Sequence, residues 1–148
     1  SFHPDVYENI VSGKKIFEHR RVFPNEPIKA YLYIGAPVSA ISGILYLGKR
    51  HVISDWAEKF RDDRSALKRI REYQKKQRYA MEILKFEETN VIPLMQLRNE
   101  IDNFVVPQMY YYLTDTELLE YLEKRIIKTG LTVEHSFENI TSNDVCHY

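Results

Sequence analysis

The stretch "IKAYLYIGAPVSAISGILYLGKRHVI", residues 28–53, is the most strand-like part of this chain of 148 residues. In its first half, small or aliphatic residues alternate with tyrosines: Ala30, Tyr31, Leu32, Tyr33 and Ile34. Because successive side chains of a strand point to opposite faces, this alternation predicts one buried face and one face lined by tyrosines.

Glycine and proline punctuate the rest of this stretch. The sequence Gly35-Ala36-Pro37 breaks the first strand, and residues 41–47 predict a second strand that ends at Gly48. Gly43 lies inside the second strand, where a glycine indicates a bulge or a close backbone approach. The two strands together are expected to form the centre of a sheet.

Helical patterns flank this pair of strands. A short helix is predicted over residues 4–12, followed by an extended segment over 15–22. After the strands, Ser54 is predicted to cap a long helix that begins at Asp55 and ends near Arg78. The charged sequence "RDDRS" within it favours an interruption.

The second half of the chain mixes short strands and helices. Strands are predicted over residues 79–86 and 108–113, with a short helix between them in 92–101. Thr114 or Thr116 is predicted to cap a helix whose pattern continues to Ile126, and Gly130 is predicted to end it. The final polar residues, 136–148, are expected to be loosely ordered. This order predicts an α+β fold around a small, mixed, partly closed β-barrel with flanking helices.

The composition excludes several classes of protein. Twenty-one basic residues balance twenty-one acidic residues, which argues against a protein that coats nucleic acid everywhere but allows a local basic groove. Cys146 is the only cysteine, so an internal disulfide and a cysteine-based zinc cluster are both excluded. No apolar run has the length of a membrane span, and no signal-peptide pattern opens the chain. A soluble, cytoplasmic protein without a membrane partner is predicted.

Charge is concentrated in "VSGKKIFEHRRVFP", residues 11–24. One interpretation is an edge strand whose charges prevent aggregation. The other is the wall of a site for an anionic ligand. In a strand, Glu18 and Arg20 share a face about 7 Å apart. Pairing between them would fix the orientation of the guanidinium group, which suits recognition of a planar or phosphate group.

The sequence "GKKIFEHR", residues 13–20, resembles G-x-K-x-x-E-x-R, the signature of the ASCH domains, a branch of the PUA-like superfamily. Residues 3–21 are similar to the opening helix and motif of that family, and residues 33–49 are similar to its strand-turn-strand. The closing half, including "YAMEILKFEE" and the Pro-Gln of "FVVPQMYYYL", also resembles it. The resemblance covers about residues 2–113. It predicts a domain over residues 1–113, and residues 114–148 are expected to form a helix and tail packed on the same domain.

The resemblance implies a cleft beside the motif that binds single-stranded or modified RNA, or a nucleoside. Lys15, Glu18 and Arg20 take the motif positions and are expected to hold the anionic ligand. Small residues of the strand-turn-strand are expected to let the ligand approach the backbone. The candidate ligand-binding residues are Lys15, Glu18, Arg20, Arg21, Tyr33, Ala36, Pro37, Gly43, Gln108 and Tyr110.

Two other functions remain open. Some small ASCH-like enzymes similar to this chain hydrolyse acetylated cytidine with a lysine, a threonine and a glutamate. Lys15 stands at the lysine, whereas Glu18 occupies the threonine position, so a metal-free hydrolase, including a ribonuclease, would use these two residues as its catalytic groups. The third residue is left open among Glu82, Glu87 and Glu88. A protein-interaction module that uses the helix of residues 114–126 is the remaining alternative.

Further patterns bear on the ligand. Residues 59–78 hold nine of the basic residues and three acidic ones, which predicts either a nucleic-acid surface or a solvated helix face. Among the eleven tyrosines, Tyr33 and Tyr110 are the candidates for base stacking. The five histidines lack metal-ligand spacing, and no phosphate-binding glycine loop is present. Neither a metal nor a cofactor is therefore predicted.

Overall fold

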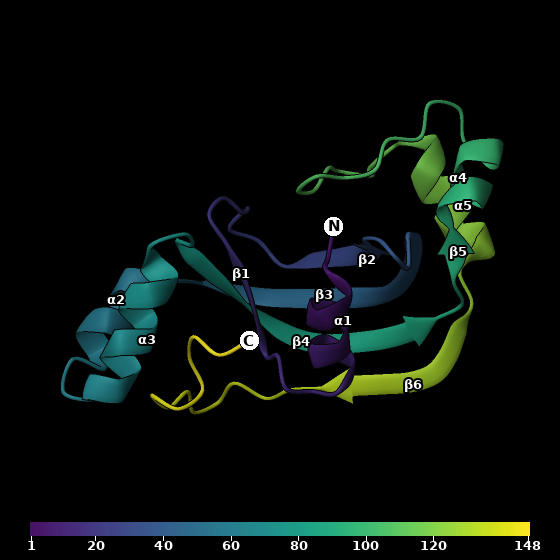
Figure 1. Ribbon diagram of the computed structural model, residues 1–148. Helices are drawn as coiled ribbons and strands as arrows, with labels where there is room; N and C mark the ends of the chain where they lie inside the picture. Colours follow the sequence, from purple (N-terminus) through teal and green to yellow (C-terminus); the bar gives the residue numbers. More distant parts are fainter.

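The computed structural model describes residues 1–148, which form a curled antiparallel sheet with helices at both ends (Figure 1). The strands are β1 (Phe17–Arg20), β2 (Ile28–Ile34), β3 (Ala40–Val52), β4 (Tyr79–Thr89), β5 (Ile92–Pro93) and β6 (Lys128–Glu134). They follow the order β1-β4-β3-β2, while β5 pairs with β3 and β6 pairs with β4. This half-barrel confirms the predicted α+β fold.

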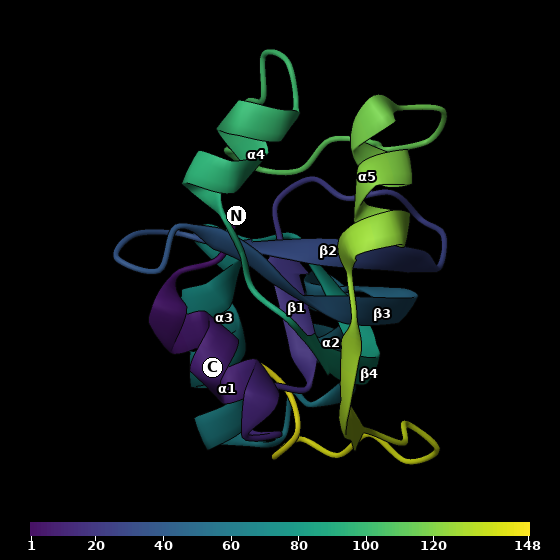
Figure 2. The same cartoon turned by 90° about the vertical axis from the view of Figure 1, so that its right-hand side faces the viewer.

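Five helices surround the sheet: α1 (Pro4–Val11), α2 (Ile53–Lys59), α3 (Arg64–Gln74), α4 (Leu94–Glu100) and α5 (Glu117–Arg125). Helices α2 and α3 lie at one end of the sheet, and α4 and α5 lie together at the other end (Figures 1 and 2). Helix α1 places Ile10 in the core against the sheet. No helix has both the length and the apolar composition needed to cross a bilayer.

The β2–β3 pair has the predicted alternation, but both of its faces are covered. Leu32 and Ile34 lie in a core cluster with Ile10 and Phe86, whereas Tyr33 belongs to a second cluster under α4 and α5. That second cluster also buries Leu118 and Leu122 of α5. The apolar stripe of α5 therefore covers the sheet, which leaves the predicted interaction face largely occupied.

Both glycines of β3, Gly43 and Gly48, lie within the strand and make room for neighbouring side chains. Gly43 has a φ of +92° and lies where the pairing of β2 with β3 shifts register between Tyr31 and Tyr33, so the predicted bulge is confirmed. A Cβ on Gly43 would lie 2.7 Å from the side-chain ring of Phe86. The prediction that Gly48 ends the strand is wrong, because β3 continues to Val52. A Cβ on Gly48 would lie 2.9 Å from the side chain of Leu84. This glycine accommodates a neighbouring side chain within the sheet.

The long helix predicted from residue 55 to residue 78 is two helices. Asp63 interrupts it, because its carboxylate accepts a hydrogen bond from the backbone N–H of Ala66 at 3.1 Å and caps α3. Ser54 does not cap α2, since Ile53 is already helical and Val52 occupies the cap position. The predicted interruption at "RDDRS" is confirmed, and the predicted cap is wrong.

The C-terminal third differs most from the sequence prediction. Residues 108–113 form no strand. Gly130 does not end a helix but lies within β6, which the sequence analysis missed because six of its seven residues are exposed and show no alternation. The polar residues 136–148 are anchored: Val145 and Cys146 are buried, and Arg69 donates a hydrogen bond of 2.7 Å to the backbone oxygen of Ser142.

Candidate functional site

The motif begins in a tight turn at the end of α1. Gly13 has a φ of +80°, and its N–H donates to the carbonyl oxygen of Ile10 at 3.1 Å. The N–H of Lys15 then donates to the carbonyl oxygen of Asn9 at 2.9 Å, so the chain is still turning there and β1 begins only at Phe17. This turn brings Lys15 to the same side as Glu18, although the two are three residues apart.

Lys15, Glu18 and Arg20 form one cluster of charges. Lys15 and Glu18 are 4% and 6% exposed, and the Lys15 Nζ lies 3.9 Å from the Glu18 Oε1. The Arg20 Nε lies 3.7 Å from the same oxygen. Neither Oε2 of Glu18 nor Nε of Arg20 has a hydrogen-bond partner. A buried polar atom without a partner costs free energy. Both atoms are fully buried, so a ligand in the cavity would offset this cost by drawing the two side chains toward it.

The buried amine of Lys15 has an altered proton affinity. Burial lowers its pKa below the ordinary value; the Glu18 carboxylate opposes this shift and the Arg20 guanidinium adds to it. The Nζ of Lys15 donates a hydrogen bond of 2.7 Å to the backbone oxygen of Tyr148. The Lys15 ammonium therefore lies near the Glu18 carboxylate, and one of its three hydrogens is bonded to Tyr148.

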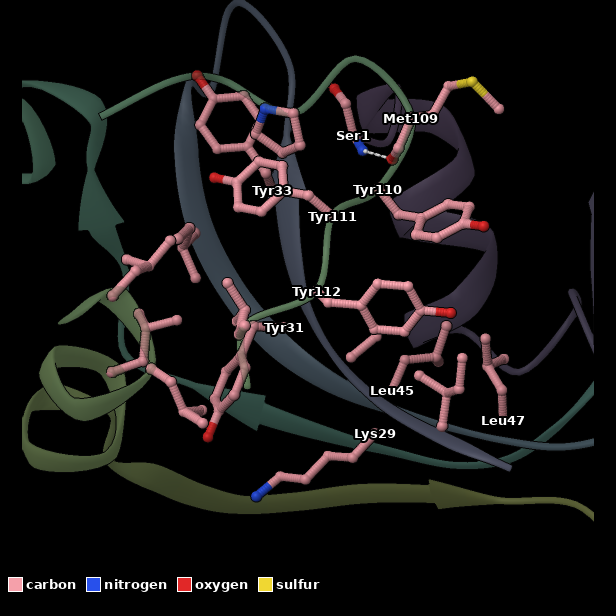
Figure 3. Close-up of a pocket in the computed structure, with 18 of the residues that line it drawn as sticks. Ser1, Lys29, Tyr31, Tyr33, Leu45, Leu47, Met109, Tyr110, Tyr111 and Tyr112 are labelled. Atoms are coloured by element: carbon pink, nitrogen blue, oxygen red, sulfur yellow. Dashed lines mark hydrogen bonds between the residues drawn. The ribbon is translucent and has the colours of Figure 1, made fainter. Parts of the chain in front are cut away.

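A cavity of about 560 Å³ lies beside Glu18 and Arg20 (Figure 3). Residues 104–114, which we call the tyrosine loop, cross over it, while β2 and β3 contribute its opposite wall. Eight aromatic residues line the cavity: Phe2, Phe23, Tyr31, Tyr33, Phe104, Tyr110, Tyr111 and Tyr112. Charged groups at its rim are Glu26, Lys29 and Glu123. The site thus combines a small number of polar groups with a mainly hydrophobic lining that includes these aromatic rings, as ligand pockets do.

The side chains of the tyrosine loop point in alternating directions. Tyr110 and Tyr112 extend to one side, above Leu45 and Leu47, and Tyr111 extends to the other side, toward Tyr33 (Figure 3). The ring centroids of Tyr110 and Tyr112 are 6.0 Å apart. All three rings are more than a third exposed. They offer aromatic faces and edges to a ligand that enters the cavity.

The structure places some of the predicted residues together and separates others. Glu18, Arg20, Tyr33 and Tyr110 line the cavity, and Lys15 contacts Glu18 from behind. The other predicted residues lie outside the lining: Arg21, Ala36, Pro37, Gly43 and Gln108. The small residues expected to form a groove instead belong to an exposed turn, in the case of Ala36 and Pro37, and to the packing against Phe86, in the case of Gly43.

The three glutamates considered for a hydrolase lie away from the cavity. The Glu82 Oε2 lies 2.7 Å from the His51 Nε2. Glu87 forms ion pairs with Lys128 and Lys85, and the hydrogen bond from Lys128 is the main cause of its lowered pKa. Glu88 accepts a hydrogen bond of 2.7 Å from Thr129. None of these carboxylates reaches the cavity beside Lys15 and Glu18.

The sequence analysis did not predict several residues that line the cavity. The two-residue periodicity of β2 could have identified two of them. Lys29 and Tyr31 precede Tyr33 at intervals of two, so they share its face of β2. Tyr111 and Tyr112 fall in the run of residues 108–113, for which the sequence predicts a strand. Phe2 precedes the first predicted helix, and Phe23 follows the predicted extended segment of residues 15–22. Only the tertiary fold brings these two rings to the cavity.

Comparison with known proteins relates this fold to solved structures. No protein-family model matches the sequence, and no curated protein sequence matches it. The crystal structure of ASCH from Zymomonas mobilis is similar, with a TM-score of 0.61 and 23% identity over 85% of this chain and 94% of that chain. A single-residue mutant of the same protein matches with a TM-score of 0.60 and 24% identity, over 83% and 93% of the two chains. The chain described above therefore has the fold of these structures.

Proposed function

We propose that this chain, which has the fold of the ASCH structures and the motif that resembles theirs, binds single-stranded or modified RNA, or a nucleotide, by taking one unpaired base into the aromatic cavity. One observation carries the proposal. Two polar atoms without partners, Oε2 of Glu18 and Nε of Arg20, belong to side chains that line a cavity with eight aromatic residues. An unpaired base offers a flat ring to such walls and a polar edge to such groups.

The chemistry of the two features is complementary. Stacking of a base on an aromatic side chain contributes about 1–3 kcal/mol and tolerates any base, because every base has a π-face. The carboxylate of Glu18 accepts hydrogen bonds only, and the guanidinium of Arg20 donates them only. A base edge with an amino group next to a carbonyl or ring nitrogen matches that pair. The stacking rings would therefore give affinity, and the charged pair would give selectivity.

Native mass spectrometry of the protein with short RNA oligomers and with modified nucleosides tests this proposal. Wild type and Arg21→Ala are expected to retain a ligand of unchanged mass, whereas Glu18→Gln and Arg20→Ala are expected to lose most of it. Arg21 is the matched control because it is adjacent in the chain and outside the cavity. Equal binding by all four proteins would refute the assignment of the site.

One observation favours a second candidate, a metal-free hydrolase. The pKa of Lys15 is lowered by burial, and an amine with a lowered pKa can serve as a nucleophile or base. Its Nζ is bonded to the backbone oxygen of Tyr148, so it would have to leave that partner to reach a substrate. In the same spectrometric experiment, turnover would release a ligand of altered mass, and Lys15→Ala would abolish that change while leaving binding in place.

A further inference from the structure

The basic residues of this chain are unevenly distributed. Residues 59–78 hold nine of the twenty-one lysines and arginines, with three acidic residues, in a chain whose net charge is zero. The rest of the chain is therefore net negative. These basic residues lie on and beside α3, at the end of the sheet opposite α4 and α5 (Figure 1).

The outward side of α3 carries a row of cations. Arg64, Lys68, Arg71 and Lys75, which we call the α3 basic row, follow one another at intervals of three or four residues, and all are exposed. Ala66 and Ile70 are buried on the opposite side of the helix. Lys75 pairs with Glu72 at 2.9 Å, whereas the other three cations make no ion pair.

This arrangement is unfavourable for the helix by itself. Like charges three or four residues apart on a helix repel each other and destabilise it. Because three of the four cations have no carboxylate partner within the chain, that repulsion is not offset inside the fold. A bound polyanion would offset it.

Further arginines lie around the start of β4, between the end of α3 and Arg20 of the cavity lining. The backbone N–H of Arg78 donates a hydrogen bond of 3.2 Å to the carbonyl oxygen of Arg20, which lines the cavity. The guanidinium groups of Arg50 and Arg78 lie 4.0 Å and 5.3 Å from the centroid of the Tyr79 ring, at the start of β4. The chain leads directly from α3 into β4, the neighbour of β1 (Figure 1).

We propose that the α3 basic row binds the sugar–phosphate backbone of a single-stranded RNA whose base occupies the cavity. This inference rests on the proposed function and extends it, because it makes the ligand a polynucleotide instead of a free nucleoside. Lysine and arginine contact phosphates without reading sequence, so the row supplies affinity and position while the cavity selects the base.

The surface suits RNA better than a lipid membrane. A helix that binds a membrane surface inserts an apolar face between the lipids. The apolar face of α3 is buried in the core, and no large hydrophobic side chain is exposed within residues 59–78. The outward side of α3 carries charged side chains and no large apolar side chain that could insert into a membrane.

The test measures binding of a fluorescently labelled single-stranded RNA across a series of salt concentrations. The row variant is the double substitution Arg64→Ala with Lys68→Ala, and alanine preserves helix propensity. The control variant, Arg98→Ala with Lys124→Ala, removes the same two kinds of charge from exposed sites that also make no ion pair. The row variant is expected to lose roughly tenfold in affinity, and its slope of log K against log salt is expected to be shallower by about 1.4.

A second titration separates this inference from the proposed function. A nucleoside monophosphate is expected to bind the row variant as it binds wild type, whereas Arg20→Ala is expected to lose it. If Arg20→Ala keeps both ligands, the cavity assignment fails, and with it the claim that one strand joins the two sites. If the row variant matches the control variant in RNA affinity and salt slope, the inference is wrong. Binding to anionic phospholipid vesicles in place of RNA would also overturn it.

Discussion

The two faces of β1 show how one short strand serves two purposes. Glu18 and Arg20 line the cavity, where each retains a polar atom without a partner. Phe17 and His19 point the other way, into a packed aromatic cluster: the Phe17 ring lies 5.0 Å from Trp56, and the His19 ring lies 4.6 Å from Tyr73. The cavity face can gain interactions from a ligand, whereas the other face is filled by aromatic side chains, although the Nε2 of His19 also lacks a hydrogen-bond partner there.

Because neighbouring residues of β1 point to opposite faces, substitutions in this strand can change either ligand affinity or the free energy of unfolding. A substitution on the packed face removes buried contacts and should lower the free energy of unfolding. On the cavity face, the ion pairs of Glu18 with Lys15 and Arg20 are longer than a hydrogen bond, at 3.9 Å and 3.7 Å. A substitution there should lower the affinity for a ligand and change the free energy of unfolding little. Four changes on or beside this strand test that separation.

The largest expected effect comes from Phe17→Ala. Phe17 is 1% exposed, and truncating a buried phenylalanine costs about 3–5 kcal/mol of unfolding free energy. Denaturant unfolding followed by circular dichroism measures this loss. Phe17→Leu retains most of the buried volume and should cost less than half as much. A loss below about 1 kcal/mol for the alanine variant would mean that this face is not a packed core.

His19 predicts a pH dependence of stability. Burial, together with the neighbouring Lys15 ammonium, lowers the pKa of His19 from 6.5 to about 3. Between these values the unfolded chain binds a proton that the folded chain does not, so stability falls as the pH drops below 6.5. The expected slope approaches about 1.4 kcal/mol per pH unit, or about 3 kcal/mol by pH 4.

The His19→Leu variant isolates this contribution from that of the carboxylates. The difference in unfolding free energy between wild type and variant should shrink or reverse in favour of the variant as the pH falls from 7 to 4. Denaturant titrations at a series of pH values measure it. Parallel curves for the two proteins would show that His19 titrates normally in the folded state.

On the cavity face, Arg20→Ala should reduce affinity for a nucleotide by about 10- to 100-fold, because a charge-assisted hydrogen bond is worth about 1.5–3 kcal/mol. Isothermal titration calorimetry measures the loss. The free energy of unfolding should change by less than about 1 kcal/mol, since the ion pair with Glu18 is a single contact at 3.7 Å. A large loss of stability with unchanged affinity would assign Arg20 to the fold instead of the site.

The smallest effect is expected for Arg21→Ala, which removes an exposed charge outside the cavity lining. Affinity for a mononucleotide should change less than threefold, and the free energy of unfolding by less than about 0.5 kcal/mol. The same calorimetric and unfolding experiments measure both. A loss of affinity equal to that of Arg20→Ala would place the ligand over the exposed residues that follow β1, outside the cavity.

The sequence predicted the parts of the fold that carry their own periodicity. Alternation located β2, strand-like sequence located the beginning of β3 and most of β4, and the charge pattern located Glu18 and Arg20. The motif alone did not show that Lys15 faces Glu18, since that depends on the turn at Gly13. It also could not show that the Lys15 amine is bonded to Tyr148, which lies 133 residues away.

The C-terminal third was less predictable for a physical reason. The run "QMYYYL" has strand-forming residues, but none of them pairs with a strand. Strand β6 has only one partly buried residue, Val133, and exists because it pairs with β4. The tail is polar, yet Ser142 donates a hydrogen bond of 2.6 Å to Asp63 and is held by Arg69. Each of these outcomes depends on a distant partner that local patterns do not reveal.

The most direct test of the central claim is an NMR titration of the ¹⁵N-labelled protein with a nucleoside monophosphate. Shifts are expected for backbone amides of residues 18–20, 29–33 and 104–114, which border the cavity. The indole N–H of Trp56, which is 4% exposed and packs against the opposite face of β1, should not move. Shifts centred on Trp56 and His51, or no shifts at any concentration, would contradict the claim that the cavity binds a base.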